Sequence, residues 1–196
     1  MTDYYQQHSE EYHRKTFTLD PASFLEPLIR YIEPGSSILD IGCGSGRDIG
    51  WLKQHGYQSK GLERASGLIA LAREETGCEV FEEDFDTYNF ESTKYDALIM
   101  IGSLVHVRHE DMERTLRRIL GALSQGGHVL LTLKEGMGFK QADDGRLFVL
   151  WDSEAAENIF ERLNLKVVEL KRQVSKLDAE DVWLSYVLRY MPPGAK

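Results

Sequence analysis

A glycine-rich turn in the stretch SILDIGCGSGRDIG is the first feature that indicates a chemical role, because Gly42, Gly44 and Gly46 alternate. Glycines in such a turn let the backbone approach a bound ligand closely. The dinucleotide fingerprint G-x-G-x-x-G fits only in part, since its third glycine falls on Arg47, and no G-K-[ST] of a phosphate-binding loop follows. The pattern is D-x-G-x-G-x-G, and an acid at Asp40 disfavours a pyrophosphate and favours a ligand with a positive group near the turn.

Two further acidic positions follow at the ends of the next two predicted strands. Glu63 lies roughly 20 residues beyond the turn, where a carboxylate takes the hydroxyls of a ribose. Asp84 ends a cluster of three acids and can accept from an adenine amino group, and the Phe85 ring can stack on the base. A cationic amino-acid end, a ribose and an adenine, in this order, match S-adenosylmethionine.

Alternating strands and helices must position these residues. We predict strands at residues 36–42, 57–63, 78–84, 95–102, 128–134, 165–174 and 181–190, and helices at 19–35, 47–56, 66–77, 109–127 and 152–164. This alternation predicts an α/β fold, a Rossmann-like, doubly wound, mostly parallel sheet of seven strands. The short connection between the last two strands predicts an antiparallel hairpin there. In such sheets ligands bind outside the carboxyl ends of the strands, which is where the glycine turn lies.

Five segments together carry a family resemblance: ILDIGCGSGRD, GLERASGLIALA, EEDF, YDALIMIGSLVHV and LSQGGHVLLTLKEG. They resemble the class I S-adenosylmethionine-dependent methyltransferases over about residues 36–135. Their spacing is similar to that of the small-molecule branch, with ubiquinone-biosynthesis, trans-aconitate and tellurite-resistance enzymes as relatives. The resemblance implies S-adenosylmethionine as cofactor, S-adenosylhomocysteine as product and a small-molecule acceptor.

The resemblance also implies a set of residues around the cofactor. These residues are Tyr12, Asp40, Gly42, Cys43, Gly44, Glu63, Arg64, Asp84, Phe85, Gly102 and Ser103. Asp40 and the turn would hold the methionine end, and Gly102 and Ser103 would line the space near the sulfonium. Arg64 departs from the small or apolar residue usual at its position. Asp40 could instead organise the turn through backbone hydrogen bonds.

The N-terminal segment and the remainder of the chain are predicted to form one methyltransferase domain, residues 1–196. Residues 1–19 would serve as a lid on the cofactor, and 20–196 as the Rossmann-like core. Tyr4, Tyr5 and Tyr12 are the lid candidates, although they could equally cap the core.

His106 is the candidate general base, because it follows the fourth strand and histidine titrates near neutrality. A base is needed only if the acceptor carries a proton at working pH. The alternatives are a histidine that caps the next helix or fills a gap; His109 is expected to cap that helix. The pair lacks further ligands, so we predict no metal site. No [DNS]-P-P-[YF] or Pro-Cys follows, which disfavours exocyclic-amine and cytosine C5 chemistry.

Two basic residues after the fifth strand, Arg146 and Lys134, are the candidates for substrate binding. Either could pair with a carboxylate or phosphate on the acceptor, or belong to a solvated rim. We expect the residues between them to form a flexible loop that closes as a lid, hinged at Gly136, Gly138 and Gly145.

The composition bounds the partners and the location. The 196 residues carry a net charge of −9 without a basic run, which disfavours nucleic acid. No apolar run approaches the roughly 20 residues that span a bilayer, so no membrane partner is expected. The N-terminus has no apolar signal region and the two cysteines form no disulfide pattern, so we expect a cytoplasmic location. The residues do not indicate an oligomeric state.

Two other functions are open at this point. The chain could be a catalytically silent module that binds S-adenosylmethionine or a partner protein. It could also be an NAD-dependent oxidoreductase, which Arg47 in place of the third glycine disfavours.

Overall fold

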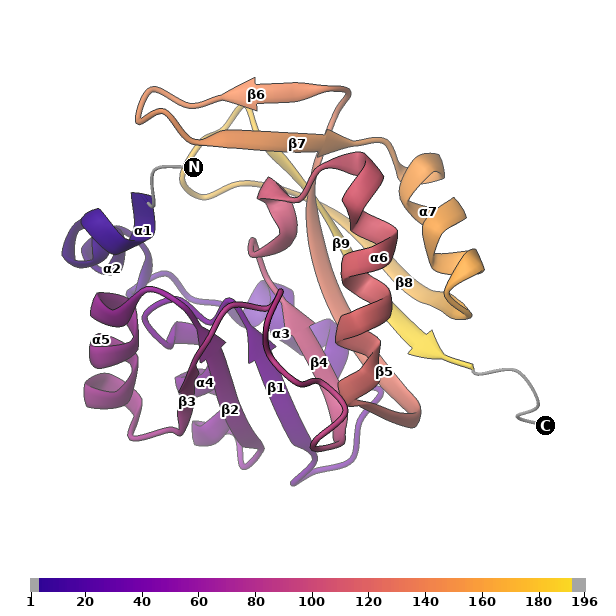
Figure 1. The fold of residues 1–196 in the computed structure, drawn as a ribbon, viewed down its shortest axis with the longest axis horizontal. Helices are drawn as coiled ribbons and strands as arrows, with labels where there is room; N and C mark the ends of the chain where they lie inside the picture. The colour runs from indigo at the N-terminus through magenta and orange to yellow at the C-terminus, as the bar shows by residue number, and fades with distance from the viewer. Residues whose placement is uncertain (1–3, 192–196) are drawn as a thin grey trace.

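The computed structural model describes residues 4–191, and its centre is a mixed β-sheet (Figure 1). The strands in this part are β1 (Ser37–Ile41), β2 (Gln58–Glu63), β3 (Val80–Glu82), β4 (Tyr95–Met100), β5 (Leu123–Glu135), β6 (Phe139–Gln141), β7 (Leu147–Trp151), β8 (Leu165–Val174) and β9 (Val182–Tyr190). Strands β3, β2, β1, β4 and β5 lie in this order and are parallel, while β9 runs antiparallel to both β5 and β8. The predicted Rossmann-like sheet with an antiparallel C-terminal hairpin is confirmed, and β6 and β7 add to its seven strands.

Helices cover both faces of the sheet. They are α1 (Tyr4–Gln7), α2 (Ser9–Thr16), α3 (Ala22–Ile29), α4 (Arg47–Gln54), α5 (Ser66–Thr76), α6 (His109–Ile119) and α7 (Ser153–Arg162), with 3₁₀ turns η1 (Leu104–His106) and η2 (Leu120–Ala122). Successive strand residues point to opposite faces. Ile38 therefore packs with Leu25 of α3 and Leu52 of α4, whereas Leu39 packs in the cluster that holds Leu116 of α6. Figure 1 shows α3 and α4 behind the sheet and α6 in front of it.

The predicted helix over 109–127 is too long, because α6 ends at Ile119 and β5 already begins at Leu123. Gly126 has a φ of +76°, which a right-handed helix does not contain, and the register between β4 and β5 shifts in this region. The helix predicted over 19–35 is likewise limited to α3, residues 22–29. In the described part of the chain, no helix has the length and apolar character that crossing a bilayer requires.

The predicted flexible loop after β5 is instead a hairpin of β6 and β7. Phe139, Lys140 and Gln141 pair with Val149, Phe148 and Leu147. The turn between the two strands is closed by a hydrogen bond from Gly145 N to the Ala142 carbonyl, 2.9 Å long. Residues 147–151, for which the sequence predicted no element, supply the partner strand that turns the loop into a hairpin.

The long strand β5 has two different partners at its carboxyl end. Lys134 pairs with Trp183 of β9 and also with Leu150 of β7. A strand residue has one neighbour on each side, so β7 occupies the side of β5 that β4 leaves where Met100 pairs with Leu131. The hairpin therefore lies beyond the carboxyl end of β4, next to η1 (Figure 1).

Candidate active site

A cavity of about 820 Å³ lies beyond the carboxyl ends of the parallel strands. The predicted site residues that line it are Tyr12, Gly42, Gly44, Glu63, Arg64, Asp84, Phe85, Gly102, Ser103, His106 and Arg146. Its size is within the range usual for small-molecule sites. A more open hollow of about 630 Å³ beside α7 is lined by Glu154, Glu157 and other residues outside the predicted site.

The glycine turn between β1 and α4 has a backbone that favours glycine. Gly42, Gly44 and Gly46 have φ angles of +75°, +56° and +88°. A Cβ atom on Gly42 would lie 2.5 Å from Cβ of Ser103, and one on Gly44 would lie 3.4 Å from the ring of Tyr12. The absence of side chains therefore allows Ser103 and Tyr12 to approach the turn, and Gly42 and Gly44 both border the cavity.

Glu63, at the end of β2, ties the glycine turn to the start of α5. Its Oε2 accepts a hydrogen bond from Gly44 N at 3.0 Å. Its Oε1 accepts from the backbone N–H groups of Arg64 and Ala65 at 2.9 and 3.0 Å. A carboxylate has about four acceptor positions, so capacity remains on Glu63 for hydroxyl groups of a ligand in the cavity.

Asp40 and Cys43 lie behind the turn and do not line the cavity. Asp40 is 2% exposed, and its Oδ2 has no hydrogen-bond partner. Burial raises the pKa of Asp40 well above its usual value, the Asp48 carboxylate raises it further, and Arg47 acts in the opposite direction. The Cys43 side chain faces β2, where a Cβ on Gly61 would lie 2.5 Å from its Sγ. Contacts of these two residues with a cofactor remain predictions.

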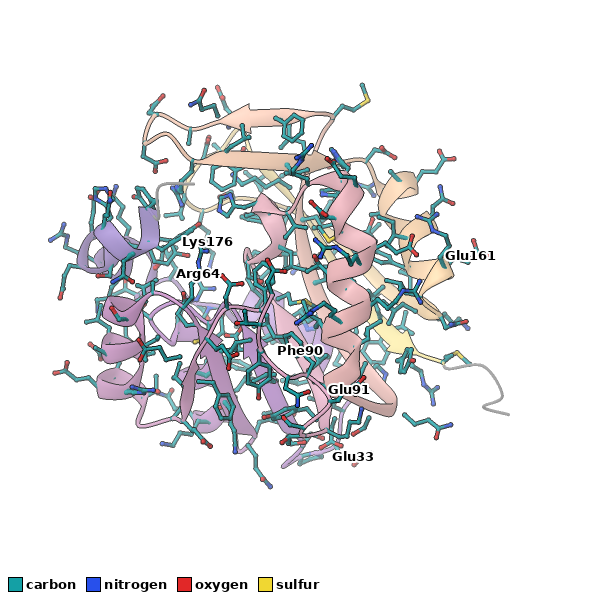
Figure 2. The ribbon with its side chains drawn as sticks, in the orientation of Figure 1. Glu33, Arg64, Phe90, Glu91, Glu161 and Lys176 are labelled. Carbon is teal, nitrogen blue, oxygen red and sulfur yellow. The ribbon has the colours of Figure 1, made fainter. Side chains whose placement is uncertain are left out.

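Asp84 and Phe85, after β3, border another part of the cavity. The Asp84 carboxylate accepts from the backbone N–H of Asp86 at 2.9 Å and from Nη1 of Arg64 at 3.2 Å. Figure 2 shows Arg64 beyond the carboxyl ends of β2 and β3. The position at which the chain departs from the family pattern thus forms an ion pair with the residue expected near adenine, although exposed pairs of this kind contribute little stability.

His106 is held by two hydrogen bonds that define its chemistry. Its Nδ1 lies 2.6 Å from the carbonyl oxygen of Leu147, which can only accept, so Nδ1 carries a proton. Nε2 lies 2.9 Å from the Tyr5 hydroxyl and accepts its proton in a hydrogen bond when the ring is neutral. Burial lowers the pKa of His106, and the positive charges of Arg146, Arg64 and Lys134 lower it further against the effect of the Leu147 carbonyl. A neutral imidazole at pH 7 is the form that a general base requires.

The upper wall of the cavity is formed by α1 and the β6–β7 turn, which meet through Arg146. Its guanidinium lies 4.5 Å from the ring centroid of Tyr4, and Nη1 lies 3.5 Å from the Tyr5 hydroxyl. Asp144 neutralises the guanidinium through a 2.7 Å ion pair. Burial raises the pKa of Tyr5, whose ring also makes an edge contact with that of Tyr12 at 5.2 Å.

Lys134 is not at the cavity, which departs from the role expected for it from the sequence. Its ammonium group is buried in an ion pair with Asp181. Several residues on the first turns of α6 and just before it do line the cavity and were not predicted to do so. These residues are Arg108, Asp111, Arg114 and Thr115. Alternating acids and bases on a helix surface are usually solvated, so nothing in their pattern distinguishes them.

Among the residues that the structure describes, no three or more His, Cys, Asp or Glu side chains are grouped so as to hold a metal ion. His109, expected to cap α6, is the first residue of that helix, and its Nε2 lies 2.9 Å from the Leu150 carbonyl of β7. Both histidines of this segment therefore contact the hairpin.

Comparison with known proteins relates part of the chain to methyltransferases. Residues 38–127 match the family described as "Methyltransferase domain". A probable tRNA methyltransferase 9B of Mus musculus is 31% identical over 101 residues, which are 50% of this chain and 22% of that protein. A phosphoethanolamine N-methyltransferase 2 of Caenorhabditis elegans is 28% identical over 137 residues, which are 66% and 31% of the two chains. The chain thus spans less than a third of the length of these relatives.

Solved structures share the fold. The Burkholderia thailandensis 1,6-didemethyltoxoflavin-N1-methyltransferase, with bound S-adenosylhomocysteine, superposes with a TM-score of 0.78 at 18% identity, over 95% of this chain and 84% of that one. A TehB-like S-adenosylmethionine-dependent methyltransferase from Corynebacterium glutamicum gives a TM-score of 0.69 at 21% identity, over 93% and 97%. One relative is named for tRNA, so the expectation, drawn from the net charge, that this chain has no nucleic-acid partner is not supported.

Proposed function

We propose that this chain, which carries a class I S-adenosylmethionine-dependent methyltransferase domain, transfers a methyl group from S-adenosylmethionine to a small-molecule acceptor. One observation carries the proposal: a single cavity is bordered by the glycine turn, by Glu63, by Asp84 with Phe85, and by His106. The first three of these groups, at the ends of β1, β2 and β3, follow the order of methionine, ribose and adenine in the cofactor.

The residues present fit this cofactor. The backbone of Gly42 and Gly44 borders the cavity, where it can contact the methionine end, and the remaining acceptor capacity of Glu63 suits ribose hydroxyls. Phe85 offers a ring face for adenine. When bound, S-adenosylmethionine supplies a methyl group already activated by the sulfonium. What remains for the chain is to orient the acceptor in line with it, an effect of roughly 7–11 kcal/mol.

His106 and Tyr5 would handle the proton of the acceptor. The Nε2 lone pair that now accepts from the Tyr5 hydroxyl is available to an acceptor hydroxyl or amine, directly or through Tyr5. General base catalysis contributes typically about 10²- to 10⁴-fold to the rate. The Leu147 carbonyl keeps the imidazole in the tautomer whose Nε2 is unprotonated.

A small acceptor is favoured over a nucleic acid by the closure of the cavity. Helix α1 and the β6–β7 turn meet above it through Arg146, Tyr4 and Tyr5. A ligand must therefore fit inside the cavity beneath the contact between α1 and the β6–β7 turn, or else move these two segments apart. The relatives named for tRNA and for phosphoethanolamine make both acceptor classes worth testing.

The test is methyl transfer from labelled S-adenosylmethionine to two panels, small amines, phenols and carboxylates in one and total tRNA in the other. We expect transfer to a member of the first panel, and a large decrease in rate for His106→Ala with unchanged binding of S-adenosylhomocysteine. Transfer to tRNA alone would overturn the small-molecule part of the proposal. Unchanged rates for His106→Ala would remove the histidine from the reaction.

A further inference from the structure

The side chain of Lys134 is buried at the point where β5 changes partners. Its ammonium group pairs with Asp181, and the two side chains are only 8% and 7% exposed. The second carboxylate oxygen of Asp181 accepts from Lys140 of β6 at 2.8 Å. The Lys134 ammonium also lies 4.0 Å from the ring centroid of Phe148 and 5.4 Å from that of Trp183. A buried charge is unfavourable unless it is paired, so this ammonium holds its neighbours in one arrangement.

Phe148 connects this buried cation to the candidate base. Its ring lies 5.0 Å from the imidazole of His106 and 5.2 Å from the guanidinium of Arg146. Leu147, the preceding residue, supplies the carbonyl that fixes Nδ1 of His106. Together with the Tyr5 hydroxyl, two consecutive residues of β7 therefore hold the imidazole, and Lys134 contacts one of them directly.

Lys134 also contacts Trp183, which lies behind a second part of the cavity lining. The indole of Trp183 lies behind Gly102, where a Cβ atom would be 3.6 Å from it. The cavity is lined by Gly102 and Leu147 but not by Lys134 or Trp183. Any influence of Lys134 on a bound acceptor is therefore exerted through the groups in front of it.

We propose that Lys134 is a positioning residue: by holding Phe148 and β7 against the sheet, it fixes the imidazole of His106 for the proton transfer of the proposed function, on which this inference rests. The β6–β7 hairpin is then a fixed wall of the site rather than the mobile lid that its glycines predict. Movement that admits the acceptor belongs instead to α1, on the other side of the Arg146 contact.

The test is NMR of the histidine side chains in the full chain, with His106 assigned from the spectrum of His106→Asn. Lys134→Gln is the main variant, since Asp181 keeps Lys140 as its cation and glutamine can still donate to it. Lys134→Arg is the conservative variant, and Lys140→Gln is the matched control that removes the other, more exposed partner of Asp181. For each protein the pH titration is carried out twice, once in the presence of S-adenosylhomocysteine and once in its absence.

We expect Lys134→Gln to lose the nuclear Overhauser contacts between His106 and Phe148. These contacts decide the test, because loss of the Lys134 charge by itself raises the pKa of His106. The Kd for S-adenosylhomocysteine should stay within about threefold of the wild-type value. Lys134→Arg should restore the contacts, and Lys140→Gln should retain them. Wild-type contacts between His106 and Phe148 in Lys134→Gln would overturn the inference, as would an equal loss of these contacts in Lys140→Gln.

If Lys134→Gln does not fold, Phe148→Leu decides, because it keeps the Lys134–Asp181 pair but removes the ring between that pair and His106. An unchanged His106 titration in Phe148→Leu would argue against positioning, and a changed titration would support it. Failure of the wild-type chain to bind S-adenosylhomocysteine would contradict the proposed function. The ligand-free spectra would still decide the role of Lys134.

Discussion

The Tyr5 hydroxyl donates a hydrogen bond to Nε2 of His106 at 2.9 Å, across 101 residues of chain. One residue belongs to α1 and the other to η1, so the pair exists only while α1 lies over the cavity. The other ring nitrogen is fixed by Leu147 of the hairpin. Closure of the N-terminal helix and the state of the candidate base are therefore linked.

The first prediction concerns the Tyr5 hydroxyl. Tyr5→Phe keeps the ring contacts with Tyr12 and Arg146 but removes the hydrogen bond to His106. We expect the rate of methyl transfer to fall by about 10²-fold, the lower end of acid–base contributions, with little change in cofactor affinity. Steady-state kinetics and calorimetry measure the two quantities. Tyr57→Phe, just before β2, is the control, and equal rates for both variants would exclude a role for the Tyr5 hydroxyl.

The second prediction is the pH dependence that His106 imposes. Burial and nearby cations hold its pKa below the ordinary 6.5, and the neutral ring is the active form. The rate should therefore rise with pH through this lowered pKa, with an acid limb below pH 6.5. Arg146→Met removes a cation and should move the limb to higher pH. A limb that stays in place in Arg146→Met would contradict this electrostatic effect.

The same shift has a consequence for stability. The folded state binds a proton on His106 less readily than the unfolded state does. The stability that comes from the neutral imidazole is therefore complete above the pKa of the unfolded state. It is lost as the pH falls through the folded pKa. Denaturant unfolding of wild type and His106→Asn between pH 7 and pH 5 should show a smaller pH dependence in the variant.

A third prediction separates backbone strain from close packing in the glycine turn. Gly42 and Gly35 have similar φ angles, +75° and +82°, but only a Cβ on Gly42 meets a neighbour, Ser103, at 2.5 Å. Gly35→Ala should lose stability from strain alone, about 1–2 kcal/mol, and keep its affinity for S-adenosylhomocysteine. Gly42→Ala should lose more stability and most of its affinity. Thermal unfolding measures the stability and calorimetry the affinity. Equal affinities of the two variants would show that the turn at Gly42 is not part of the cofactor site.

A fourth prediction concerns the hydrogen bonds of Glu63. Glu63→Gln leaves one acceptor oxygen for the N–H groups of Gly44, Arg64 and Ala65. Leaving a partly buried donor unsatisfied costs about 1–3 kcal/mol, and affinity for S-adenosylhomocysteine should fall at least about tenfold. The control is Glu79→Gln, which breaks an exposed ion pair with Lys60 and should change neither the stability nor the affinity for S-adenosylhomocysteine. A Glu63→Gln variant with wild-type affinity would show that the carboxylate is not needed for binding.

The parallel part of the sheet could be predicted because each of its signals is local. Buried strands such as Tyr95–Met100 are continuous apolar runs, and the alternating glycines follow the first of them directly. The residues at the strand ends then meet at one edge by topology alone. For this reason Glu63, Asp84 and Gly102 could be grouped around one cavity before any contact was known.

The hairpin and its contacts could not be predicted, because they depend on pairing between distant segments. Whether residues 139–141 form a strand depends on residues 147–151 and on how far β5 extends beyond β4. Lys134 and Arg146 are equivalent as basic residues near this loop, yet one pairs with Asp181 inside the protein and the other lines the cavity. The partner of Lys134 lies 47 residues away, and no local pattern points to it.

Calorimetric titration with S-adenosylhomocysteine, with NAD⁺ and NADH in parallel, is the sharpest test of which cofactor the cavity holds. We predict binding in the micromolar range for S-adenosylhomocysteine, a large loss of that binding in Glu63→Ala, and no signal from either nicotinamide. Absence of binding to S-adenosylhomocysteine, or a nicotinamide signal in its place, would show that the cavity does not serve a methyltransferase.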